Sequence, residues 1–171
     1  MPENSISRRS LTKSAAWSVP VVAVAVAAPM AAASTTVDIV VSGSCATLSV
    51  VGTAGTAPRF TASAVGGGVI PAQTQFTLSS TSLASVNVQA AGASVEVLPN
   101  GDRVLTVLAD TTSLTVSLTP GSGIDVVLLA SFTLSVRSIP TGYVDSNAAN
   151  NSASRNFSGT SLFGTFTGLC V

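Results

Sequence analysis

The chain has 171 residues, with seven Lys and Arg residues, seven Asp and Glu residues and no His. Charged residues make up 8% of it, against about 25% in an ordinary soluble protein. The scarcity of Lys and Arg excludes a nucleic-acid-binding protein, which needs a clustered positive surface. The absence of His excludes Ser-His-Asp and Cys-His catalysis. Apolar residues reach 46%, which excludes a charged disordered tail.

Residues 1–33 have the pattern of an export signal. A short polar segment precedes an apolar stretch over 15–28, and small residues then lead to a predicted cleavage after Ala33. The apolar stretch is shorter than the roughly 20 residues that span a bilayer, so we expect no stable transmembrane segment. An uncleaved leader that tethers the domain to a membrane is the alternative.

The polar segment reads Ser-Arg-Arg-Ser-Leu-Thr-Lys over 7–13 and resembles the twin-arginine signal, Ser-Arg-Arg-x-Phe-Leu-Lys. Arg8 and Arg9 form the arginine pair, Leu11 replaces Phe, and Thr12 departs from Leu. The leader is also similar to those of actinobacterial surface proteins. The resemblance implies that the twin-arginine machinery and a signal peptidase are partners, and that the protein folds before export. A general secretory signal that contains two arginines is the alternative.

Residues 34–171 have the size of a single domain. They hold four Arg, six acidic residues and no Lys, and 4 − 6 gives a net charge of −2. Their surface must therefore consist mainly of uncharged polar residues. The only two cysteines are Cys45 and Cys170, and an even pair in an exported protein predicts a disulfide. This bridge would join the two ends of the domain, and a bridge between two chains is the alternative.

Apolar residues after residue 33 recur with a period of two, which indicates β-strands. No window shows a helical stripe, and we expect eight to ten short strands. The fold class predicted is therefore all-β, an antiparallel immunoglobulin-like β-sandwich. The candidate segments are 37–41, 46–51, 59–65, 75–79, 86–90, 93–98, 103–108, 114–118, 124–136 (one long strand with a bulge, or two strands), 153–157 and 162–166.

Two further patterns refine this prediction. Asn100-Gly101 lies between alternating apolar runs, and because both residue types tolerate positive φ it predicts a hairpin of 93–98 with 103–108. A turn is predicted around 52–55 and another at the three glycines of 66–68. The phenylalanines lie within strand-like runs, so we expect them in the core: Phe60, Phe76, Phe132, Phe157, Phe163 and Phe166.

The segment 143–153 is rich in Asn, whose side chains bond back to nearby backbone and fix loops. Asp145, Asn147 and Asn150 are weak candidates for calcium ligands, because a calcium site usually has several carboxylates and only Asp145 is charged. We therefore predict no metal site and no cofactor.

The same segment, Asp-Ser-Asn-Ala-Ala-Asn-Asn-Ser-Ala over 145–153, resembles the part before the last strand of bacterial surface immunoglobulin-like repeats of the cell-adhesion type. Their pattern is Asp-x-Asn-Pro-x-Asn-Asn. Ala148 stands where proline is usual, and the earlier Asn-x-Gly signature of the family is missing. The resemblance implies an immunoglobulin-like fold and a surface role.

We expect no enzymatic activity. Glu96 and Asp102 flank the predicted Asn-Gly turn, where solvated charges are ordinary. The predicted function is that of a secreted or cell-surface structural or adhesive protein, whose partners are other surface proteins, a cell-wall polymer or a second copy of itself. The alternative is a secreted binding module for a carbohydrate or a small apolar ligand. An unprotected edge strand would favour self-association, because no lysine after residue 33 is available to shield one.

The twin-arginine interpretation predicts the effect of a conservative change. Replacing Arg8 and Arg9 together by Lys should keep the precursor inside the cell and remove the exported 34–171 product, because the pathway recognises the arginine pair. Intact masses of cell and culture fractions measure this, with Arg137→Lys as the control. Undiminished export of the 34–171 product by the double variant would show that the leader uses the general secretory route.

Overall fold

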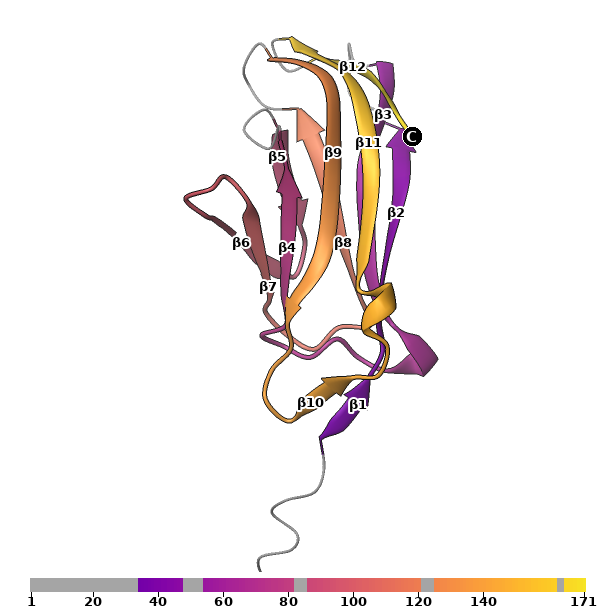
Figure 1. Ribbon diagram of the computed structural model, residues 1–171, viewed down its shortest axis with the longest axis vertical. Helices are drawn as coiled ribbons and strands as arrows, with labels where there is room; N and C mark the ends of the chain where they lie inside the picture. The colour runs from indigo at the N-terminus through magenta and orange to yellow at the C-terminus, as the bar shows by residue number, and fades with distance from the viewer. Residues whose placement is uncertain (1–33, 48–53, 82–85, 121–124, 163–164) are drawn as a thin grey trace, which may run out of the picture. The chain divides into compact units, whose positions relative to one another are not determined.

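The computed structural model describes residues 34–47, 54–81, 86–120, 125–162 and 165–171. Thr35–Val171 is one compact unit. The described chain contains strands and two short 3-10 turns, η2 (Val65–Gly67) and η4 (Ala148–Asn150), and no α-helix. Its strands are β1 (Thr35–Val37), β2 (Ile39–Thr47), β3 (Ala54–Ala64), β4 (Gln75–Ser80), β5 (Val86–Ala90), β6 (Ala93–Val97), β7 (Arg103–Val107), β8 (Ser113–Pro120), β9 (Asp125–Ser138), β10 (Tyr143–Asp145), β11 (Ser152–Leu162) and β12 (Thr165–Cys170) (Figure 1).

The strands form two antiparallel sheets, which confirms the predicted all-β sandwich. The first sheet has the order β5-β8-β3-β2, and the second has the order β6-β7-β4-β9-β11-β12. A short parallel pairing of β12 with β3 joins the two sheets, at Thr167↔Ala54 and Gly168↔Gly55. The short strands β1 and β10 pair in parallel beside them.

The strand order is immunoglobulin-like. In a constant-type immunoglobulin domain, strands A-B-E-D form one sheet and C-F-G the other. Here β2-β3-β8-β5 and β4-β9-β11 have those orders. The β6–β7 hairpin is added beside β4, and β12 is added beyond β11.

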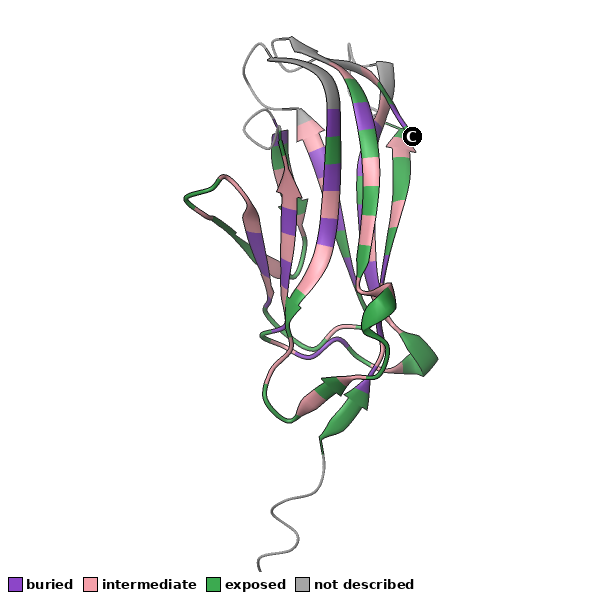
Figure 2. Ribbon diagram, in the orientation of Figure 1, coloured by how far each residue is buried: buried purple, intermediate pink, exposed green. Residues whose placement is uncertain are grey.

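The core lies between the two sheets because apolar and polar residues alternate along the strands. In β9, Phe132 and Leu134 are buried while Ser131 is exposed, and buried and less buried positions alternate visibly along β4 and β9 (Figure 2). Full burial of one such side chain contributes about 1.5–3 kcal/mol. The prediction of a phenylalanine core is confirmed at four positions; Phe163 lies outside the described residues, as does the side chain of Phe166. The four fully buried phenylalanines are Phe60, Phe76, Phe132 and Phe157.

Several predicted boundaries were wrong. The predicted strand 37–41 is interrupted at Asp38, between β1 and β2, and the predicted strand 162–166 contains the end of β11 and the start of β12. The break expected between 41 and 46 does not exist, since β2 pairs with β3 without interruption from Ile39↔Ala64 to Thr47↔Thr56. The small residues of this stretch fit the ladder, and the hydroxyls of Ser42 and Ser44 donate to backbone carbonyls of β3. Ladder pairing with a neighbour outweighs weak local strand propensity. For the same reason the turn predicted around 52–55 is wrong at 54–55, which begin β3, while 48–53 lie outside the described residues.

The long run over 124–136 is one strand with a bulge, as the first of the two predicted alternatives stated. The pairing of β9 with β11 passes from Ala130↔Phe157 to Val127↔Gly159, so β9 has one residue more than its partner there. Such an extra residue bends a strand and increases its twist. No predicted strand covers β10, which lies in the Asn-rich segment.

The predicted hairpin is confirmed. Its loop closes with Leu98 N–H donating to Asp102 O at 2.8 Å and Gly101 N–H donating to Leu98 O at 2.9 Å. Gly101 has φ of 92°, and Asn100 has no positive φ. This is a three-residue loop with glycine in the left-handed region.

Gly168 in β12 lies against the ring of Phe157. A Cβ atom at residue 168 would overlap that ring and lie 2.7 Å from Ser158 O. We expect Gly168→Ala to lower the free energy of unfolding by about 1–3 kcal/mol, since overpacking forces the backbone or the ring to move. Urea unfolding measures this, with Gly68→Ala as the control, because a Cβ there meets its nearest atom at an ordinary 3.4 Å. Equal stability of the two variants would contradict the prediction.

Candidate functional site

One side of the sandwich is closed by a disulfide. Cys45 in β2 is bonded to Cys170 at the end of β12, and their Cα atoms are 5.6 Å apart. The predicted pairing within one chain is confirmed. The bond links the last strand of the first sheet to the last strand of the second.

Hydrogen bonds reinforce this closed side. The Arg155 guanidinium in β11 donates to Gly43 O in β2. Cys170 N–H donates to the Thr56 hydroxyl of β3 at 3.0 Å. At the end of the chain, Asn156 and Val171 exchange backbone hydrogen bonds of 2.9 and 3.0 Å. The first two contacts connect the second sheet to the first, and the last pair fixes the end of the chain to β11.

The opposite side, called the open side below, has no strand pairing between the two sheets among the described residues, and the turn at 91–92 connects β5 to β6 there. It ends in β5 on the first sheet and β6 on the second, and among the described strands β6 pairs only with β7. The hairpin that β6 forms with β7 projects sideways from the sandwich (Figure 1). In β5 Val86 is buried, whereas in β6 Val95 and Val97 are 40% and 61% exposed. Glu96 is the only charged residue of β6.

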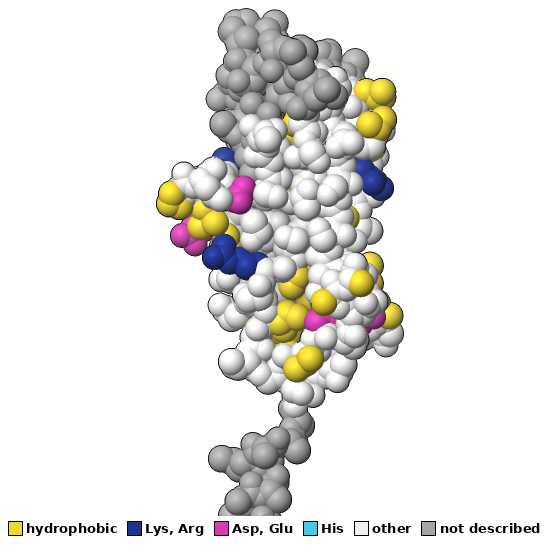
Figure 3. All heavy atoms as spheres, viewed as in Figure 1, with side chains coloured by type: hydrophobic (Ala, Val, Ile, Leu, Met, Phe, Trp, Pro, Cys, Tyr) yellow, Lys and Arg dark blue, Asp and Glu magenta, His cyan; other side chains and the backbone are white. Residues whose placement is uncertain are grey.

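The exposure of Val95 and Val97 follows from the unequal width of the sheets. Val95 pairs with Leu105, which is fully buried, so both side chains stand on the core-facing side of the second sheet. That sheet has six strands and the first has four. The core-facing side of β6 therefore extends beyond the cover of the first sheet. Apolar side chains show on the hairpin in the space-filling view, next to acidic ones (Figure 3).

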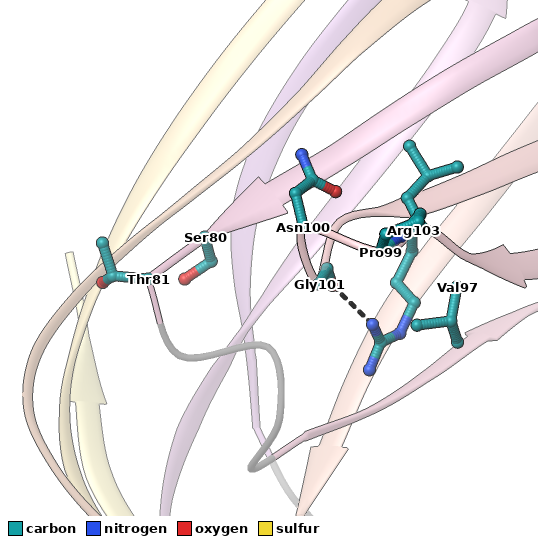
Figure 4. A pocket seen from close by; sticks show the side chains of 8 residues that line it. Ser80, Thr81, Val97, Pro99, Asn100, Gly101 and Arg103 are labelled. Atoms are coloured by element: carbon teal, nitrogen blue, oxygen red, sulfur yellow. Dashed lines mark hydrogen bonds between the residues drawn. The ribbon is translucent and has the colours of Figure 1, made fainter.

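A hollow of about 420 Å³ lies beside this hairpin. Ser80 and Thr81 at the end of β4 line it, together with Val97 and Leu98 and the Arg103 side chain of β7 (Figure 4). The Arg103 guanidinium donates to Gly101 O of the hairpin loop. The hollow therefore combines apolar side chains and hydroxyl groups with the Arg103 guanidinium.

The three calcium candidates take part in one local and one long-range hydrogen bond. Asp145 Oδ1 accepts a hydrogen bond from Asn147 N–H at 2.9 Å, and the Asn147 side chain is exposed. Asn150 instead donates its side-chain amide to Asp38 Oδ1 at 2.8 Å. Sequence reasoning missed Asp38, which is 112 residues from Asn150 and has no local signal. This hydrogen bond connects the segment between β1 and β2 to η4.

The described residues contain no group of three or more His, Cys, Asp or Glu side chains that could hold a metal ion. Three buried oxygens of the segment have no hydrogen-bond partner: Asp145 Oδ2, Asn150 Oδ1 and Asn151 Oδ1. Of the two acids considered for catalysis, Asp102 accepts a hydrogen bond from the Asn100 side chain at 2.9 Å, and Glu96 is exposed on β6.

The predicted export residues Arg8, Arg9 and Ala33 lie outside the described residues. Over the part of the chain that is described, no helix has the length and apolar character needed to span a membrane. Comparison with known proteins finds no matching family model and no curated protein of similar sequence.

The closed side predicts how strongly the disulfide stabilises the sandwich. Replacing Cys45 and Cys170 together by Ser should lower the free energy of unfolding by up to ~4–5 kcal/mol, because the bond closes a loop of more than a hundred residues in the unfolded chain. Urea unfolding with and without reductant measures this, and reductant should have no effect on the double variant. If reductant leaves the unfolding of the wild type unchanged, the bond does not stabilise the fold.

Proposed function

We propose that this chain is an exported structural or adhesive β-sandwich domain of a bacterial surface, which acts by contact and without chemistry. The observation that carries the proposal is the asymmetry of the sandwich. One side is closed by Cys45–Cys170, and the other exposes an apolar edge strand, β6. Exposed apolar strand edges are templates for pairing with another chain.

Three further observations support a location outside the cytoplasm. The twin-arginine resemblance of residues 7–13 is the first. A disulfide persists in oxidising compartments and is rare in the cytosol. Away from the hairpin and the apolar group near β10, the face seen in Figure 3 is formed mainly by backbone and uncharged polar side chains. Such a surface does not steer charged ligands and suits contact with polymers or other surface proteins.

A binding module for a small ligand is the second candidate function. The hollow beside the hairpin favours it, because Val97, Leu98 and Arg103 bring apolar surface and a cation together. This arrangement fits an apolar molecule with a polar or anionic end better than a carbohydrate. Carbohydrate stacking relies on Tyr and Trp, and after residue 33 the chain has one Tyr and no Trp.

Deletion of the chain from its native host tests the proposal. We expect the 34–171 product in the wall fraction of the parent strain, and weaker cell aggregation or wall integrity in the deletion strain, restored by the wild-type chain. Non-denaturing mass spectrometry of the recovered protein distinguishes the second candidate. A soluble monomer with a small molecule bound, and a deletion strain with normal aggregation and wall integrity, would replace the adhesive function by the binding module.

A further inference from the structure

We propose that β6 is a self-pairing edge, which binds β6 of a second copy in antiparallel orientation with the two-fold axis at Val95. The proposal rests on the proposed contact function and names the partner of the open side. It follows from three properties of β6, which are the direction of its backbone groups, the position of its one charge and the exposure of its valines.

On the side away from β7, the backbone of β6 has groups that can form a second ladder of hydrogen bonds. In an antiparallel pair, residues alternate between those that bond to the partner strand and those whose N–H and C=O point away. Leu98 N–H donates to Asp102 O, and Leu108 N–H donates to Gly92 O. The backbone N–H and C=O groups of the even-numbered residues of this strand therefore point toward β7. The N–H and C=O groups of Ala93, Val95 and Val97 therefore point to the open edge.

The register follows from overlap and charge. Centring the two-fold axis on Val95 pairs all five residues of β6 with the second copy, with Ala93 opposite Val97 and Ser94 opposite Glu96. Centring it on Glu96 would place two carboxylates directly opposite each other, which is destabilising. Centring it on Ser94 would leave Val97 outside the strand pairing. Only the Val95 register combines full overlap with separated charges.

The side chains favour the same arrangement. Val95 would face Val95 of the second copy, and β-branched residues directly opposite each other stabilise a sheet. Val97, which is 61% exposed in the single chain, would pack beside Ala93 of the second copy. Strands that must stay unpaired usually carry Lys, Pro or a bulge, and β6, with the sequence Ala-Ser-Val-Glu-Val, has none of these.

Such a short ladder predicts a weak dimer. The contact is smaller than the 1,200–2,000 Å² or so of a standard stable interface, so pairing should be reversible and dependent on concentration. Many copies held on one surface would pair far more effectively, since linked sites raise the effective concentration. Weak pairing of this kind suits a contact function between surfaces.

Sedimentation of the purified 34–171 chain tests the pairing. We expect reversible formation of a dimer as concentration rises into the range of hundreds of micromolar, and a dissociation constant raised roughly tenfold or more by Val95→Lys, because the lysine places two like charges at the axis. Val144→Lys is the matched control, since Val144 in β10 is 52% exposed and lies outside β6. A wild-type chain that stays monomeric overturns the proposal, as does equal weakening of the dimer by both variants.

Cysteine cross-linking tests the register and does not depend on the stability of a charged variant. Val95→Cys should cross-link to itself through a short thiol-specific reagent, whereas Val97→Cys should cross-link efficiently only with Ala93→Cys in a mixed sample. Val144→Cys is the control. Self-linking of Val97→Cys in preference to Val95→Cys would overturn the register.

The tests on the purified protein and the deletion experiment in the host distinguish failure of the self-pairing from failure of the contact function. Loss of cell aggregation on deletion, together with a monomeric purified chain, would keep the contact function and reject the self-pairing of β6. A dimer that needs Val95, together with normal aggregation and wall retention, would keep the self-pairing and reject the adhesive function.

Discussion

The bond between Cys45 and Cys170 is the covalent constraint that closes one side of the two-sheet core. Among the described residues, the direct strand pairing between the sheets consists of two residue pairs of β12 with β3, which is a short ladder to hold two sheets together. The disulfide lies on the same side and links β2 to β12 covalently. Because it joins segments 125 residues apart in sequence, it also restricts the unfolded chain more than a local bridge would. The β5–β6 side has no such bond, because the chain's two cysteines are both used in this disulfide.

The open side shows how sheet width controls exposure. A two-layer sandwich covers a strand only as far as the facing sheet extends, and here six strands face four. The hairpin added at β4 therefore carries valines that alternate correctly for a core but meet solvent. A chain with ordinary charge content would place lysines at such an edge. This chain has one charge in β6, the carboxylate of Glu96, and in the proposed pairing that charge selects the register.

Much of the fold could be predicted from local sequence. The two-residue period identified most strands, and Asn100-Gly101 identified the hairpin, because both signals depend only on neighbouring residues. The continuity of β2 through Ser42–Cys45 could not be predicted, since it depends on ladder bonds to β3. The hydrogen bond from Asn150 to Asp38 could not be predicted for a similar reason. The two residues are 112 apart in sequence, and they lie next to the paired strands β1 and β10.

Local sequence was enough to predict the all-β class and the hairpin, because alternation and turn chemistry involve neighbouring residues. Two cysteines allow one pairing within a chain, but the structure was needed to show that pairing. Which edge is unpaired and which valines are exposed also became known only from the three-dimensional arrangement. Val95 alternates in the sequence as a core residue would, yet it is 40% exposed because it lies in the edge strand β6. The order of strands in a sheet is set by contacts between distant segments, and the candidate site is a consequence of that order.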